Sequence, residues 1–145
     1  IIVRGKNYHA EDLEQCAEGV PGVRRGGVVA FGVFDEQAST DRVVVVAETK
    51  EPDEATQRVI AQRVGEAVME GTGLPVDEVV VVPPSTIPKT SSGKRQRHLC
   101  KLQYMNGTLR AHREGKLALG IAFVRSQAGA MRMGTRRLRR MLTEE

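Results

Sequence analysis

The sequence predicts a small α+β domain with a three-stranded mixed sheet, helices packed on it, an N-terminal hairpin and a basic C-terminal extension. Apolar, β-branched runs at residues 27–34, 42–48 and 79–82 have the length and composition of strands. Apolar residues recur at helical spacing between these runs. A chain of 145 residues is long enough for one domain with a modest core.

The N-terminal segment predicts a hairpin followed by a helix. Residues 1–3 have the composition of a short apolar strand, and the next four, Arg4-Gly5-Lys6-Asn7, are typical of a turn. Four apolar residues then share one helical face: Leu13, Cys16, Ala17 and Val20. The Pro21-Gly22 pair ends this helix.

The middle of the chain predicts a strand pair and a crossover. Residues 27–34 and 42–48 are separated by a polar, loop-like stretch, which favours an antiparallel pair. The continuous apolar run in the second segment is typical of a strand that is covered on both faces. Asp53 has the side chain of an N-cap for a helix to about Glu70, and residues 79–82 follow as a strand parallel to 42–48. A last helical face is expected from Leu99, Leu102, Met105 and Leu109.

Cysteine and histidine spacing argues against a metal site. Cys16 and Cys100 lack metal-ligand spacing and are expected to be reduced, buried thiols of a cytoplasmic protein. The three histidines are too scattered to form a metal centre: His9, His98 and His112. No apolar run reaches the ~20 residues that a membrane-spanning helix needs, so no membrane span is expected.

A basic, hydroxyl-rich loop at residues 87–97 is where the sequence predicts chemistry. Pro88 restricts its backbone and Gly93 frees it, and a helix that starts near Lys94 would direct its N-terminus at an anion. The phosphate loop of nucleotide hydrolases requires a glycine five positions before its Gly-Lys pair and a Ser or Thr after it. Pro88 and Arg95 occupy those positions, which excludes that motif.

Two motifs carry a resemblance to a known superfamily. The loop sequence Pro-Lys-Thr-Ser-Ser-Gly-Lys at 88–94 is similar to a signature near the C-terminus of adenylate-forming enzymes, which include acyl-CoA synthetases, peptide-synthetase adenylation domains and luciferases. Residues 1–14 resemble the motif that opens the small C-terminal domain of that superfamily, in the form seen in fatty acyl-AMP ligases. The motifs occur in the family's order and at roughly its separation, so the resemblance covers residues 1–109.

The resemblance implies that this chain is the mobile C-terminal lid domain of a fatty-acid-activating ligase. Such an enzyme converts a fatty acid and ATP to acyl-AMP and pyrophosphate, then transfers the acyl group to a pantetheine thiol. Lys94 would be the catalytic residue, because an ammonium between the carboxylate and the α-phosphate offsets their repulsion. Loop residues expected to bind substrate or nucleotide are Ser92, Gly93 and Lys89. The thiol-transfer hairpin would consist of Arg4, Gly5 and Lys6.

The implied partners are an N-terminal adenylation domain of the same enzyme and an acyl carrier protein or CoA. ATP or AMP, with Mg, would be bound mainly by that other domain, since this chain has no glycine-rich phosphate-binding run. The chain starts inside a motif and is expected to be a fragment that folds but does not catalyse alone. The sequence departs from the family pattern at Ala10-Glu11, where proline and glutamine are common, and at Arg95, which would place a second cation beside Lys94.

The basic charge is concentrated in the predicted extension. Residues 110–145 carry 9 Lys and Arg against 3 Asp and Glu, whereas residues 1–109 carry 13 against 15. The high pI therefore does not indicate a nucleic-acid-binding fold, and no nucleic-acid partner is expected. An alternative interpretation is a stand-alone interaction module that has the lid fold and binds a partner enzyme or carrier protein. Deletion of residues 110–145 would then abolish a salt-sensitive association.

Overall fold

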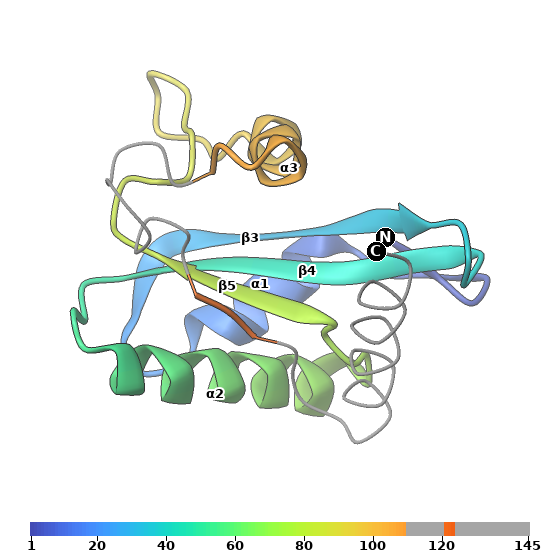
Figure 1. Ribbon diagram of the computed structural model, residues 1–145, viewed down its shortest axis with the longest axis horizontal. Helices are drawn as coiled ribbons and strands as arrows, with labels where there is room; N and C mark the ends of the chain where they lie inside the picture. Colours follow the sequence, from blue (N-terminus) through green and yellow to red (C-terminus); the bar gives the residue numbers. More distant parts are fainter. Residues whose placement is uncertain (110–120, 124–145) are drawn as a thin grey trace, which may run out of the picture.

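The computed structural model describes residues 1–109 and the backbone of residues 121–123, and within them it has the predicted α+β fold (Figure 1). An N-terminal hairpin of two short strands precedes a mixed sheet with helices on both faces. The elements are β1 (Ile2–Val3), β2 (Lys6–Asn7), α1 (Ala10–Glu18), β3 (Val23–Asp35), β4 (Thr40–Thr49), α2 (Glu54–Thr72), β5 (Glu78–Val82), α3 (Arg97–Asn106) and β6 (Ile121–Phe123).

The sheet has the strand order β3-β4-β5-β6. β3 and β4 are antiparallel, with Ala30 opposite Val45, and β4 and β5 are parallel, with Val46 opposite Val80. The predicted antiparallel pair and the predicted parallel crossover are therefore confirmed. β6 adds a short antiparallel strand beside β5, in a stretch that the sequence analysis assigned to the basic extension. The remainder of that extension lies outside the described residues.

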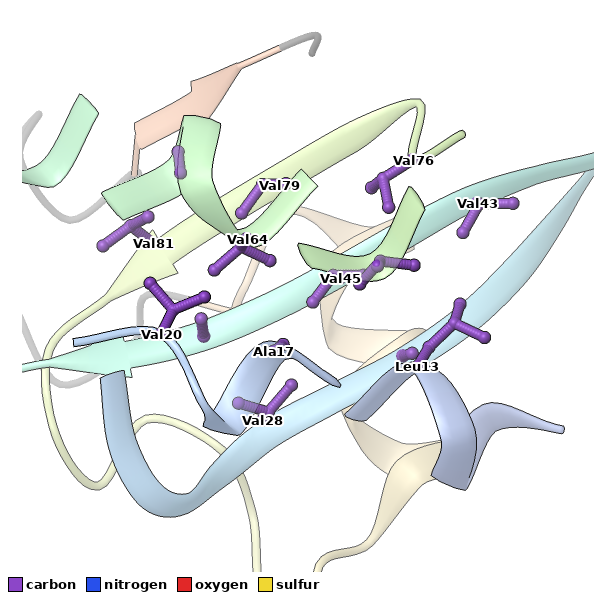
Figure 2. Packing of buried hydrophobic residues seen from close by; sticks show 14 of the residues in the cluster. Leu13, Ala17, Val20, Val28, Val43, Val45, Val64, Val76, Val79 and Val81 are labelled. Atoms are coloured by element: carbon purple, nitrogen blue, oxygen red, sulfur yellow. The ribbon is translucent and has the colours of Figure 1, made fainter. Parts of the chain in front are cut away.

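The central strands are buried on both faces because they separate two apolar clusters. One cluster, between the sheet and the helices α1 and α2, includes Leu13, Val45 and Val64 (Figure 2). The other lies under α3 and the loop before it, and includes Val46 and Cys100. Figure 1 shows α1 and α2 on one side of the sheet and α3 on the other.

Helix α2 begins and ends close to where the sequence predicts. The Asp53 carboxylate accepts a hydrogen bond from the backbone N–H of Thr56 at 2.9 Å, as predicted for an N-cap. This hydrogen bond lowers the pKa of the Asp53 carboxyl. Gly73 ends the helix in the left-handed conformation, with φ of 76°.

Helix α3 differs from the prediction in its start and in its buried face. It begins at Arg97 because residues 88–96 form a hairpin, so the expected helix start near Lys94 was wrong. Cys100 and Leu109 are buried, whereas the other three predicted core residues are 39%, 41% and 56% exposed: Leu99, Leu102 and Met105. This short helix has apolar side chains on two sides. The residue spacing predicted the side with Leu99 as the buried one, whereas the side with Cys100 packs against the sheet.

The two cysteines are both free, and they differ in burial. Cys100 is buried, whereas Cys16 is only partly buried, so full burial of both thiols was an overstatement. Among the described residues, no helix has the length and apolarity that crossing a bilayer requires.

Candidate functional site

The loop with the Lys94 motif is a tight hairpin that projects beyond α3 (Figure 1). Lys89 and Arg95 pair as an antiparallel bridge, and the Thr90 N–H donates to the Lys94 carbonyl at 2.8 Å. The chain reverses through a turn in which the Gly93 N–H donates to the Thr90 carbonyl at 2.9 Å. Gly93 has φ of 90°, a conformation that residues with a side chain rarely adopt. Lys94 follows it, and its N–H donates to Thr90 Oγ1 at 3.0 Å.

A buried carboxylate holds the start of this loop. Glu48 is 0% exposed on β4, and its Oε2 accepts the Ile87 N–H at 2.9 Å. Its Oε1 accepts a hydrogen bond from Arg24 Nη1 at 3.0 Å. Gly27 lies against the same carboxylate: a Cβ at this position would be 2.8 Å from Glu48 Oε1. The first end of the loop is therefore tied to the edge strand β3 and to β4, which lies next to it in the sheet.

A second buried carboxylate holds the end of the loop. Glu14 is 1% exposed on α1, and it accepts hydrogen bonds from Arg97 Nε and Nη2, both at 2.9 Å. The Ala30 N–H on β3 donates to Glu14 Oε2 at 2.9 Å. The hydrogen bonds to Glu14 raise the pKa of Arg97, which fixes the positive charge at this position.

Arg95 points away from Lys94 and into the domain. Its Nη1 donates to Glu18 Oε2 at 2.8 Å and to the Val28 carbonyl at 3.1 Å. The expectation that Arg95 places a second cation beside Lys94 was therefore wrong. Arg95 instead fastens the loop to the edge of the sheet.

The N-terminal motif forms a second, smaller hairpin. Its turn residues Arg4 and Gly5 have φ of 52° and 81°, which is typical of the two-residue turns that match the twist of paired strands. The Ile2 N–H donates to Asp41 Oδ2 at 2.9 Å, and the Arg4 N–H donates to Thr40 Oγ1 at 2.8 Å. These contacts attach the hairpin to the start of β4.

The two motif segments are attached at opposite ends of β4. Asp41 holds the N-terminal hairpin and Glu48 holds the Lys94 loop, seven residues further along the strand. At about 3.3 Å per residue, these anchor points are ~23 Å apart. The structure thus places the predicted site residues in two groups and does not bring the groups together.

The predicted site residues are exposed. Lys94, Lys89, Ser92 and Gly93 are exposed in one segment, and Arg4, Gly5 and Lys6 are exposed in the other. Lys94 forms no ion pair within the described part of the chain, so its ammonium is available to an anion. Lys6 Nζ lies 5.3 Å from the centre of the Tyr8 ring, which gives this half-buried aromatic residue a cation contact.

A metal centre does not form within residues 1–109, where no group of three or more His, Cys, Asp or Glu side chains has the required arrangement. Sequence reasoning also missed three residues that shape the site. These are Glu14, Glu48 and Arg97, which hold the ends of the Lys94 loop through hydrogen bonds between segments that are distant in sequence. Arg97, for example, is 83 residues from Glu14. One local signal was present: Glu48 is a charged residue at the end of an apolar strand.

Comparison with known proteins gives a family match over most of the chain. The family model described as "Disco-interacting protein 2-like, AMP domain" matches residues 1–114. The chain is 35% identical over 112 residues to the medium-chain-fatty-acid-acyl-carrier-protein ligase JamA of Moorena producens, covering 75% of this chain and 19% of that protein. It is 31% identical over 131 residues to the long-chain-fatty-acid-AMP ligase FadD32 of Mycobacterium marinum, covering 77% of this chain and 21% of that protein.

Solved structures agree with these sequence matches. A structure from a study of fatty acyl-adenylate ligases of E. coli and L. pneumophila superposes with a TM-score of 0.61 at 26% identity, covering 77% of this chain and 19% of that one. The chain therefore spans about a fifth of the length of the curated relatives and solved structures that it matches.

Proposed function

The chain belongs to the Disco-interacting protein 2-like AMP-domain family, and from this membership we propose that it is the mobile C-terminal domain of a fatty-acid-activating ligase. In this proposal a larger adenylation domain binds ATP and the fatty acid, and the present chain supplies Lys94 to the first step. The named ligases among its relatives support this reaction class.

The observation that carries the proposal is the placement of the two motifs at opposite ends of β4. Because the anchor points of the two exposed segments are ~23 Å apart along β4, we expect the segments to face one reacting centre in turn and not together. A domain that turns between two poses can present first one segment and then the other. The separation therefore supports a two-step enzyme in which each step uses a different end of this domain.

In the first step, Lys94 offsets the repulsion between two negative groups, the carboxylate of the fatty acid and the α-phosphate of ATP. The carboxylate of the fatty acid attacks the α-phosphorus of ATP, the bond to the bridging oxygen breaks, and pyrophosphate leaves with the electron pair. An ammonium placed between the carboxylate and the α-phosphate offsets their repulsion and stabilises the negative charge of the transition state. A flexible lysine with no ion pair among the described residues suits this task.

In the second step, the thiol of a pantetheine arm attacks the acyl-AMP, and AMP leaves. The exposed hairpin of Arg4, Gly5 and Lys6 would line the route of this arm. Gly5 permits a close approach to the backbone, and the two cations can meet phosphate groups. The acceptor is an acyl carrier protein or CoA. ATP, with the magnesium ion that accompanies it, would be bound mainly by the larger adenylation domain.

The test is fatty-acid-dependent exchange of pyrophosphate into ATP by the intact ligase, comparing wild type with Lys94→Ala. Loss of one preorganised charge is expected to reduce the exchange rate about a hundredfold or more. Lys89→Ala is the matched control, because this lysine is exposed in the same hairpin but follows Pro88, not Gly93. The Lys89 variant is expected to lose less than about tenfold, since a supporting charge contributes less than a positioned one.

Equal exchange in wild type and Lys94→Ala would contradict the proposal and favour the interaction-module interpretation. A second test uses the isolated chain, which is expected to fold and to release no pyrophosphate from ATP and a fatty acid. Fatty-acid-dependent pyrophosphate release by the purified chain would contradict the need for a second domain.

A further inference from the structure

We propose that Glu14 and Glu48 are positioning residues, which hold the two ends of the Lys94 loop so that Lys94 keeps one placement relative to the sheet during adenylation. This inference rests on the proposed role of Lys94. Both carboxylates are buried, and neither Glu14 nor Glu48 is among the residues expected above to bind nucleotide or to line the thiol route.

Glu48 fixes the loop through the backbone. Its carboxylate is completely buried on β4, yet it accepts a main-chain N–H from Ile87, 39 residues away in sequence. The Ile87 side chain is itself buried beneath α3, so both its backbone and its side chain are held. A buried carboxylate is costly unless donors surround it, and here Arg24 supplies the second donor. This arrangement determines where the loop leaves the sheet.

Glu14 fixes the other end through a two-pronged contact. The Arg97 guanidinium donates two hydrogen bonds to the two oxygens of Glu14, which restrains both distance and orientation. The Ala30 N–H donates to the same carboxylate and ties it to β3. Arg97 is also the first residue of α3, so this contact determines where the loop ends and the helix starts.

Between these two ends, the loop is stiffened by its own hydrogen bonds. The Gln96 N–H donates to the Pro88 carbonyl at 2.9 Å, next to the bridge between Lys89 and Arg95. A stiff hairpin held at both ends moves as one unit with its anchors. The direction in which Lys94 projects therefore depends on Glu14 and Glu48, together with the contacts of Arg95, although neither carboxylate contacts Lys94.

The experiment uses the intact ligase with Glu14→Gln and Glu48→Gln, which retain side-chain size and remove the charge. We expect kcat of pyrophosphate exchange to fall about ten- to a hundredfold, since misplacing a catalytic group by about 1 Å costs on this order. KM for ATP should change less than about threefold, because ATP is bound by the other domain. Transfer from preformed acyl-AMP to the thiol should change less than about threefold, since that step uses the other hairpin. The control is Glu54→Gln, which removes an exposed carboxylate that pairs with Arg58 and should not alter either step.

A double-mutant cycle distinguishes positioning from mere support of the fold. If Glu14 and Glu48 act through Lys94, each Gln substitution should cost little further exchange activity in a Lys94→Ala background. If Glu14→Gln does not fold, Arg97→Lys takes its place, because lysine retains the charge and cannot form the two-pronged contact. If Glu48→Gln does not fold, Arg24→Ala takes its place, because it removes a side-chain donor of Glu48.

Three outcomes would overturn the inference. The first is full exchange activity in both Gln variants while Lys94→Ala is impaired, which would leave the proposed function intact. The second is an equal loss in exchange and thiol transfer, or an undiminished loss in the Lys94→Ala background, which would indicate a structural role only. The third is full activity of Lys94→Ala, which would remove the proposed function together with this inference.

Discussion

Arg97 Nε donates to Glu14 Oε2 at 2.9 Å and thereby joins α3 to α1 across the free edge of the sheet. The two helices lie on opposite faces of the sheet, so their side chains can meet only beyond its outermost strand, β3 (Figure 1). Two backbone groups of β3 that point away from β4 form hydrogen bonds with side chains. Glu14 accepts the Ala30 N–H, and Arg95 donates to the Val28 carbonyl. Charged side chains that cover an edge strand protect it against pairing with another chain.

Arg97→Ala is expected to destabilise the domain by about 2 kcal/mol, because it leaves the buried Glu14 carboxylate without its strongest donor. Arg97 is partly exposed and Arg95 Nη2 lies 3.8 Å from Glu14, so the loss is at the lower end for a buried pair. The measurement is urea-induced unfolding at neutral pH. Arg58→Ala is the control, since its ion pair with Glu54 is exposed and should contribute less than about 0.5 kcal/mol. Equal losses in both variants would show that Glu14 does not depend on Arg97.

Gly27→Ala is expected to destabilise the domain by about 1–3 kcal/mol through overpacking. The new Cβ would lie 2.8 Å from Glu48 Oε1 and 3.1 Å from the Arg24 carbonyl. Moving the buried Glu48 carboxylate away would disturb its hydrogen bonds with Arg24 and the Ile87 N–H. Gly19→Ala is the matched control, because its Cβ would lie an ordinary 3.5 Å from the Cys16 carbonyl. Thermal unfolding compares the two variants, and an unchanged midpoint for Gly27→Ala would contradict the close approach.

The sequence predicted the elements whose signals are local. The alternation of apolar runs and helical spacing identified β3, β4, α2 and β5, and Asp53 marked the start of α2 because an N-cap depends on neighbouring residues only. The Lys94 loop and the N-terminal hairpin were located from their turn residues and their resemblance to a family. Gly93 and Gly5 indeed adopt the positive φ values that such turns require.

The parts that sequence could not predict depend on contacts between distant segments. Leu99 was predicted in the core but is 39% exposed, because the packing of α3 against the sheet turns the neighbouring Cys100 inward and Leu99 outward. The side chain of Arg95 could reach toward Lys94 or toward α1, and the carboxylate of Glu18, 77 residues away, decides the direction. Strand β6 is three residues long, too short for a pattern of its own.

Alkylation is expected to distinguish the two cysteines of the native domain. Burial raises the pKa of the Cys100 thiol to about 12, so it holds almost no thiolate at pH 8. Cys16 is partly exposed in a hollow of about 380 Å³ beside the N-terminal hairpin. Iodoacetamide should modify Cys16 at least about tenfold faster than Cys100 in the folded state, and both equally in denaturant. Peptide mass mapping of a time course measures both rates, and rapid modification of Cys100 in the folded domain would contradict its burial.

Tyr104 is expected to make the domain less stable at high pH. Its ring packs edge-to-face on Phe31 at 5.5 Å between ring centres, and its hydroxyl donates to Glu78. Burial, followed by the hydrogen bond to Glu78, raises the pKa of Tyr104 to about 12, against an ordinary value of 10.0. Because the fold favours the protonated phenol, its contribution to stability is fully present below about pH 10 and is lost as the pH rises through about 12.

When the phenolate absorbance is titrated, Tyr104→Phe should therefore remove the rise near pH 12. The same substitution should make the free energy of unfolding less dependent on pH between 10 and 12. At neutral pH the substitution should cost about 1 kcal/mol, because Glu78 loses a donor and retains Arg42 at 3.3 Å. The chain has two tyrosines, so Tyr8→Phe is the complete control for the titration. If Tyr8→Phe removed the step near pH 12 and Tyr104→Phe did not, the hydroxyl of Tyr104 would be free of Glu78 in solution.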